Sequence, residues 1–135
     1  MSSVRGRRAL VVFSDGRDER SLTTLQRTIE LARRSEVVIY AVGAGDSLED
    51  LEARDDLRIL AEETGGKAQF IQKLKGLPRI FDTVLEDLGS QYYLGYTAPK
   101  GLRGLRKVVV QVKEGSYSVR CRKRYYHDGE DGERD

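Results

Sequence analysis

Short apolar runs alternate with segments of helical periodicity in the first part of the chain. Residues 9–13 and 37–42 are continuous apolar runs, typical of strands buried on both faces of a parallel sheet, and 67–71 is a weaker third run. Between and after them, apolar residues recur every three or four positions, which predicts helices. The predicted helical faces contain Leu22, Leu25, Ile29 and Ala32, then Leu48, Leu51, Leu57, Leu60 and Ala61, then Ile80, Phe81, Val84, Leu85 and Leu88. The βαβαβα order predicts three parallel strands joined by right-handed crossovers.

Residues that favour helix ends stand at the margins of these helical segments. Ser21 is a suitable N-cap for the first helix. Gly65 and Gly66 fit a left-handed C-terminal cap that ends the second helix. Pro78 suits the first turn of the third helix. The caps therefore support the element order that the apolar pattern predicts.

Beyond the third helix the apolar period changes from helical to alternating. Segments 91–97, 107–113 and 117–126 predict three antiparallel strands, with turns at 99–101 and 114–116. One face of this extension would carry Tyr92, Leu94, Tyr96, Val108, Val110, Val112, Val119 and Cys121. The predicted fold class is thus α/β, a three-stranded parallel sheet with three helices plus a C-terminal three-stranded antiparallel extension.

The chain divides into four parts by these patterns. We predict a flexible N-terminus at 1–8, an α/β unit at 9–89, the antiparallel extension at 90–126 and a disordered acidic tail at 127–135. The length of 135 residues fits one domain.

Composition narrows the function classes only partly. Charged residues make up 34% of the chain, yet the net charge is +2, so bulk charge indicates neither nucleic acid nor membrane. No apolar run is long enough to span a bilayer, and the start lacks the apolar stretch of a signal peptide, so the sequence assigns no compartment. With one Cys and one His, an internal disulfide and the usual zinc site are both excluded.

Several segments match one family in order along the chain. They are Ala9–Gly16, which reads ALVVFSDG, Val38–Gly45, Leu57–Gly66, Ser90–Thr97, Arg106–Val110 and a basic strand ending in Tyr125 and Tyr126. Together they resemble the C-terminal half of a von Willebrand factor A domain, and in particular the VWFA-related domain of bacterial, often exported, proteins. The resemblance covers residues 7 to 126.

The resemblance implies a doubly wound sheet with a metal-ion-dependent adhesion site at the carboxyl ends of the strands. That site uses an Asp-x-Ser-x-Ser loop, a Thr from a second loop, and the Asp of a Thr/Ser-Asp-Gly loop. Only the last has a counterpart here, Asp15, because no Asp-x-Ser-x-Ser occurs in this chain. The first three strands and two helices of the family fold are absent as well. The chain therefore resembles a half domain, which would be a fragment, a separately encoded half or the product of a late start.

Asp15 is accordingly the candidate metal ligand. The neighbouring candidate binding residues are Ser14, Gly16, Asp18 and Asp46. One carboxylate binds magnesium poorly, so no cofactor is certain, and Mg²⁺ or Mn²⁺ is expected only if another segment completes the site. In the isolated chain Asp15 is expected to shape a turn.

Other patterns favour structure over catalysis. Gly43-Ala44-Gly45 lacks the third glycine of a dinucleotide fingerprint, since Leu48 stands there, so the loop is interpreted as a tight strand-to-helix turn. The carboxylates between Glu49 and Glu63 are interpreted as a solvated helix face. No set of nucleophile, base and orienting residue is visible, and the chain is predicted not to be an enzyme.

The last predicted strand places Arg120, Arg122 and Arg124 on one face. With Tyr125 and Tyr126 available to stack on bases, this row is the alternative hypothesis, a site for nucleic acid or an anionic surface. A solvated sheet face gives the same alternation and is favoured, so nucleic acid is not the expected partner.

The preferred interpretation is a non-enzymatic module for protein–protein interaction or assembly. In the family sheet, of order 3-2-1-4-5-6, the strand matching 9–14 is central, but its neighbour is absent here. Strand 9–14 should therefore present an open edge. The expected partner is a missing N-terminal half or a second copy of the chain.

Overall fold

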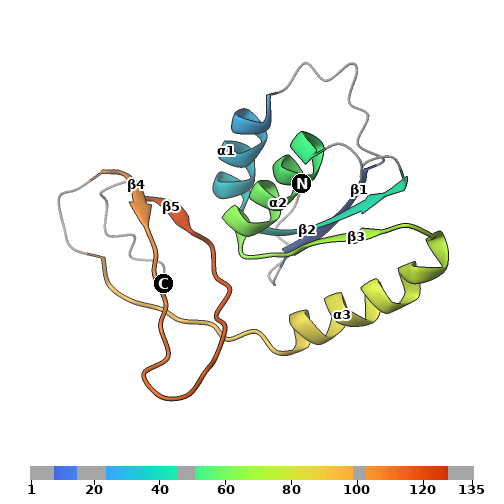
Figure 1. The fold of residues 1–135 in the computed structure, drawn as a ribbon. Helices are drawn as coiled ribbons and strands as arrows, with labels where there is room; N and C mark the ends of the chain where they lie inside the picture. Colours follow the sequence, from blue (N-terminus) through green and yellow to red (C-terminus); the bar gives the residue numbers. More distant parts are fainter. Residues whose placement is uncertain (1–7, 15–23, 46–50, 99–102, 128–135) are drawn as a thin grey trace.

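The computed structural model describes residues 8–14, 24–45, 51–98 and 103–127 (Figure 1). In chain order the elements are β1 (Arg8–Ser14), α1 (Leu25–Ser35), β2 (Val37–Ala44), α2 (Leu51–Thr64), β3 (Ala68–Ile71), the 3₁₀ turn η2 (Leu74–Gly76), α3 (Leu77–Gly89), β4 (Gly104–Lys107) and β5 (Arg124–His127). The predicted βαβαβα order and the α/β class are confirmed. No helix of the described residues is long and apolar enough to cross a membrane.

The three strands β1, β2 and β3 form one parallel sheet in that order. β1 pairs with β2 from Arg8 opposite Val37 to Ser14 opposite Gly43. β3 pairs with the second half of β2, from Ala41 opposite Ala68 onward. Because β2 lies between two strands and between helices, its middle residues are buried, as a continuous apolar run requires.

Helices cover both faces of this sheet. In Figure 1, α1 and α2 lie on one side of the strands and α3 lies on the other. The first face buries Ile29, Ala32, Ile39 and Leu60, and the second buries Tyr40, Val42, Ile80 and Val84. Successive residues of β2 alternate between the two clusters, so the arrangement is a doubly wound layer structure with a core on each face.

The helix ends follow the predicted chemistry, with one correction. α1 begins at Leu25, and its N-cap is Thr24, whose hydroxyl accepts a hydrogen bond from the Arg27 amide at 3.3 Å. The predicted cap, Ser21, lies outside the described residues. Threonine, like serine, can accept a hydrogen bond from an unpaired amide of the first helical turn. The helix therefore begins directly after Thr24. α2 ends at Thr64, and Gly65 has a left-handed φ of 86°, as predicted.

The C-terminal extension differs from the prediction of three strands. Among its described residues only β4 and β5 pair, antiparallel, with Leu105 opposite Tyr126. Residues 91–97 form no strand, and 117–123 lie outside the ladder. One further backbone hydrogen bond, from the Val108 amide to the Lys123 carbonyl at 2.9 Å, lies next to the end of the β4–β5 ladder. β5 also includes His127, which was assigned to the tail.

Burial explains why the alternating pattern did not become a three-stranded sheet. Strand propensity reflects packing against neighbours, and the described residues leave most of the predicted apolar face exposed. Tyr92 and Tyr93 are both 91% exposed, and every residue from 111 to 120 is exposed. All the buried hydrophobic residues of the described chain lie between Ile29 and Val84. The core therefore belongs to the α/β unit.

Candidate functional site

β1 forms an edge of the parallel sheet. Among the described residues its only strand partner is β2. Alternate residues of a strand turn their N–H and C=O groups to opposite sides, so about half of its seven residues point away from β2. Between Ala9 and Ser14 the strand has no charged residue and no proline, the usual features that block further pairing.

Apolar side chains remain partly uncovered on both faces of this edge. Leu10 is 50% exposed on the face of α1 and α2, and Phe13 is 52% exposed on the face of α3. The Phe13 ring lies 6.0 Å from that of Phe81, which is itself partly exposed, as is Leu85 one turn further along α3. By contrast, Val42 of β2 is fully buried. The helices thus cover β2 well and leave β1 half covered.

The candidate metal site falls mostly outside the described part of the chain. Asp15, Gly16, Asp18 and Asp46 all lie outside the described residues. Ser14 is half-buried at the end of β1, opposite Gly43, so the carboxyl ends of β1 and β2 lie on the same side of the sheet. The Ser14 hydroxyl alone does not fit the six oxygen ligands that Mg²⁺ requires. Within the described residues no cluster of three His, Cys, Asp or Glu could hold a metal.

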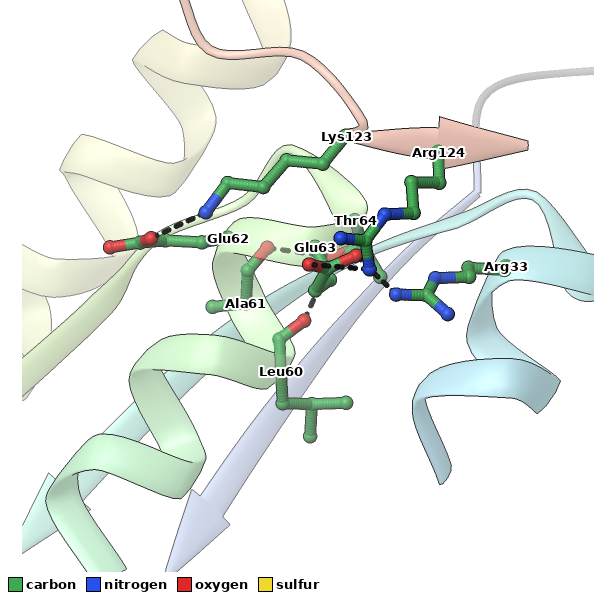
Figure 2. A network of polar contacts seen from close by, with 8 residues as sticks. All are labelled: Arg33, Leu60, Ala61, Glu62, Glu63, Thr64, Lys123 and Arg124. Carbon is green, nitrogen blue, oxygen red and sulfur yellow. Dashed lines mark hydrogen bonds and ion pairs between the residues drawn. The ribbon is translucent and has the colours of Figure 1, made fainter. Parts of the chain in front are cut away.

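A network of ion pairs around the nearly buried Glu63 joins the C-terminal end of α2 to two other elements (Figure 2). The Glu63 carboxylate accepts a hydrogen bond from Arg33 of α1 at 2.5 Å and lies 3.7 Å from the guanidinium of Arg124 of β5. Its neighbour Glu62 pairs with Lys123 at 2.8 Å, with both side chains about half exposed. Glu63 is 9% exposed, so its assignment to a solvated helix face was wrong. Helical spacing alone did not reveal that β5 lies over this position.

Backbone contacts bring the same two segments together. The Lys123 amide donates to the Glu63 carbonyl at 3.2 Å. A Cβ on Gly65 would lie 2.9 Å from the backbone nitrogen of Arg122, so a side chain there would push the extension away. The sequence predicted Gly65 as a helix cap but gave no signal that it is also a contact point for the extension.

The residues on either side of Gly65 fix the end of α2 against β2. The Thr64 hydroxyl accepts from the Ile39 amide at 2.9 Å and donates to the Ala61 carbonyl at 2.9 Å. A Cβ on Gly66 would lie 1.9 Å from the Ile39 carbonyl oxygen, so only glycine fits there. The Gly-Gly pair therefore serves both the cap and the close approach of the chain to β2.

A second polar cluster lies between β2, α3 and the extension. Arg120 pairs with Asp87 of α3 at 2.5 Å, and this hydrogen bond raises the pKa of the Arg120 guanidinium. Burial raises the pKa of the Tyr40 hydroxyl, and the nearby Asp87 charge raises it further. The Gln91 side chain hydrogen-bonds to the same hydroxyl. The cluster therefore attaches Gln91, near the start of the extension, and Arg120, near its end, to the α/β unit.

These contacts change the interpretation of the arginine row. Arg120 pairs with α3, Arg124 pairs with α2, and only Arg124 belongs to a strand. The three side chains therefore do not form one open strand face. The tyrosines also have internal partners, since the Tyr125 hydroxyl lies 2.6 Å from that of Tyr96 and Arg34 lies over the Tyr126 ring at 4.5 Å. Apart from Arg122, the residues expected to meet a nucleic acid thus contact other parts of the protein.

Comparison with known proteins gives a fold and no family. No family model and no curated protein matches the chain. A similar solved structure is the crystal structure of an uncharacterized membrane spanning protein from Vibrio fischeri, with a TM-score of 0.53 and 23% sequence identity. The similarity covers 60% of this chain and 47% of that one, so the matched part spans about half of its length. At this identity the comparison supports the α/β fold alone.

Proposed function

We propose that this chain is a non-enzymatic assembly module of the von Willebrand factor A type, and that β1 receives a strand from another polypeptide. The observation that carries the proposal is the edge position of β1, which among the described residues pairs with β2 alone and has apolar side chains half exposed on both faces. In the resembling family the corresponding strand is central, so the exposed edge lies where a further strand is expected. β-Strand addition is a common mode of recognition because main-chain hydrogen bonds supply much of the affinity.

The uncovered apolar area is large enough to contribute to association. Leu10, Phe13, Phe81 and Leu85 are each roughly half exposed. Buried aromatic side chains remove about 150–250 Å² each from water, so these four residues leave on the order of 400 Å² uncovered. Covering that area contributes about 10 kcal/mol before the cost of association, which is of similar size. Backbone hydrogen bonds along β1 would add to it.

Metal binding would require a partner that supplies the missing ligands. The Asp-x-Ser-x-Ser loop of the family site is missing here, so we propose that Asp15, with Ser14, Gly16, Asp18 and Asp46 near it in sequence, contributes to Mg²⁺ or Mn²⁺ binding only in a completed assembly. Calorimetric titration of the isolated chain should show little or no binding. Submillimolar affinity that is abolished by Asp15→Ala would contradict this.

The alternative, binding of nucleic acid through Arg120, Arg122 and Arg124, has less support. Two of these arginines pair with carboxylates of the α/β unit. Any such binding should be weak, indifferent to sequence and removed by moderate salt. A tight, sequence-selective complex at physiological salt would restore this alternative.

A pair of proline substitutions tests the proposed edge. Val11 and Val12 are adjacent in β1, so one amide points toward β2 and the other points away. The isolated chain has only a second copy to pair with, and light scattering coupled to size exclusion should show a mass that rises with concentration. One of Val11→Pro and Val12→Pro should remain folded and become monomeric, whereas the other should unfold.

The matched controls are Val11→Ala and Val12→Ala, which shorten the side chain but keep the amide. They should associate more strongly than the folded proline variant. A wild-type chain that stays monomeric at high concentration, with no apolar surface detected by dye binding, would contradict the proposal.

A further inference from the structure

The two chain segments beyond β4 and before β5 form a projecting hairpin loop, residues 108–123. Figure 1 shows this loop extending beyond the β4–β5 pair. Its tip bends at 113–116, where Gly115 has a φ of 87°. A Cβ on Gly115 would lie 2.5 Å from the Tyr117 ring, so the glycine lets this ring close over the turn. The tip is therefore a formed turn that presents an aromatic ring.

Apolar side chains are exposed along both arms of the hairpin loop. Tyr117 is 74% exposed, and Val109, Val112 and Val119 are also exposed. None of them belongs to either buried cluster of the α/β unit. Several exposed apolar side chains in one projecting loop are typical of an interaction site.

The hairpin loop and its flanks carry a strong local charge. Eight cationic residues and one acidic residue, Glu114, lie between 103 and 124, although the net charge of the whole chain is only +2. The cationic residues are Arg103, Arg106, Lys107, Lys113, Arg120, Arg122, Lys123 and Arg124. Arg120, Lys123 and Arg124 pair with carboxylates of α2 and α3. Lys107 and Lys113 are exposed and are the sequence neighbours of Val108 and Val112.

The chemistry of this surface favours an anionic lipid bilayer as its ligand. Valine and tyrosine side chains can enter the boundary between headgroups and acyl chains, and adjacent lysines attract the anionic headgroups. Tyrosine suits this boundary because its ring is apolar and its hydroxyl remains hydrated. Nucleic acid would gain little from exposed valines, since its binding depends on phosphate contacts and on flat rings. We propose that the hairpin loop docks on an anionic lipid surface, with Val112 and Tyr117 entering the interface. The proposal is independent of the β1 edge.

The absence of tryptophan from the chain allows a direct test. Tyr117→Trp places a unique fluorophore at the tip, and Leu31→Trp places one at an exposed position of α1. With vesicles of equimolar phosphatidylglycerol and phosphatidylcholine, the tip fluorophore should shift to shorter wavelength and the α1 fluorophore should not. Neither should shift with pure phosphatidylcholine, because the lysines need anionic headgroups.

Vesicle sedimentation of variants without the added tryptophan separates the contribution of the lysine charges from that of the apolar side chains. Lys107→Glu and Lys113→Glu should each weaken binding at least about fivefold, whereas Lys75→Glu, a charge change in η2, should have a smaller effect. Val112→Ser with Tyr117→Ser should weaken binding while every lysine remains. Unchanged melting temperatures would show that these variants stay folded.

Three outcomes would overturn the proposal. The first is no binding to anionic vesicles. The second is binding that the Val112 and Tyr117 changes do not weaken, which would make it purely electrostatic. The third is tighter binding to a single-stranded oligonucleotide than to the vesicles, which would assign the surface to nucleic acid.

Discussion

The α/β unit and the C-terminal extension are held by different forces. The unit buries apolar residues on both faces of the sheet, with clusters centred on Ile39 and on Val42. The described residues of the extension, 90–98 and 103–127, include no buried hydrophobic residue and contact the unit through ion pairs, hydrogen bonds and close backbone approach. Apolar burial is the dominant stabilising term in folding, whereas exposed ion pairs contribute little. The α/β unit should therefore carry most of the stability.

Gly66→Ala should have the largest effect on stability, because it disrupts the close packing of α2 against β2 within the α/β unit. The added Cβ would meet the Ile39 backbone oxygen at 1.9 Å, and neither backbone can move without displacing β2. We expect loss of cooperative melting, or a destabilisation above about 4 kcal/mol, in thermal unfolding followed by circular dichroism. Gly89→Ala is the matched control, since nothing lies within 4 Å of its Cβ, and it should be neutral or stabilising. Similar stability of the two variants would refute the close packing at Gly66.

Glu63→Ala should have the next largest effect, because its carboxylate pairs with Arg33 inside the α/β unit and also with Arg124 of the extension. The Glu63 and Arg33 side chains are 12% and 10% exposed, so removing the carboxylate leaves a nearly buried arginine without its partner. The expected loss of unfolding free energy is about 3 kcal/mol in urea titration.

Glu62→Ala is the control for that change. It removes an ion pair to Lys123 in which both side chains are about half exposed, and should cost less than about 1 kcal/mol. Limited proteolysis should then cleave the extension faster in Glu63→Ala than in Glu62→Ala. Equal costs for the two glutamates would mean that Glu63 is solvated, as its helical position alone suggested.

The smallest effect concerns alkaline pH. Burial raises the pKa of Tyr40 in the folded state above its ordinary value of 10.0, so the fold favours the neutral hydroxyl. Stability should be fully present below pH 10 and should fall as pH rises from there through the folded pKa, by about 1.4 kcal/mol per pH unit. Tyr40→Phe should remove the part of the alkaline loss of stability that comes from ionisation of this hydroxyl. Identical alkaline unfolding curves for wild type and Tyr40→Phe would contradict the assignment.

The same contrast explains what could be predicted from the sequence. The strand runs 9–13 and 37–42 and the glycine pair after α2 are local signals that buried packing reinforces, and they gave the correct elements. In the extension, the alternation of Tyr92, Leu94 and Tyr96 had no buried face to support it, and no strand formed there. An alternating pattern predicts a strand only where its apolar side chains can pack against neighbouring residues.

The candidate site was predictable only in part. The edge position of strand 9–14 is confirmed for the described residues, because the sheet order places β1 at an end. The burial of Glu63 and the pairing of Arg120 with Asp87 depend on contacts between segments far apart in the sequence, which no local period encodes. The role of Asp15 stays a prediction, since that residue lies outside the described part of the chain.

Residue-resolved amide hydrogen exchange tests the open edge of β1 most directly. In dilute solution, amides of β1 that point toward β2 should exchange slowly and those that point away should exchange fast, so that protection alternates along residues 9–13. Amides of the central strand β2 should be protected throughout. When concentration is raised or a partner is added, the fast amides of β1 should become protected. Uniform protection of β1 in a dilute monomer would show that the edge is already covered, and would contradict the proposed assembly.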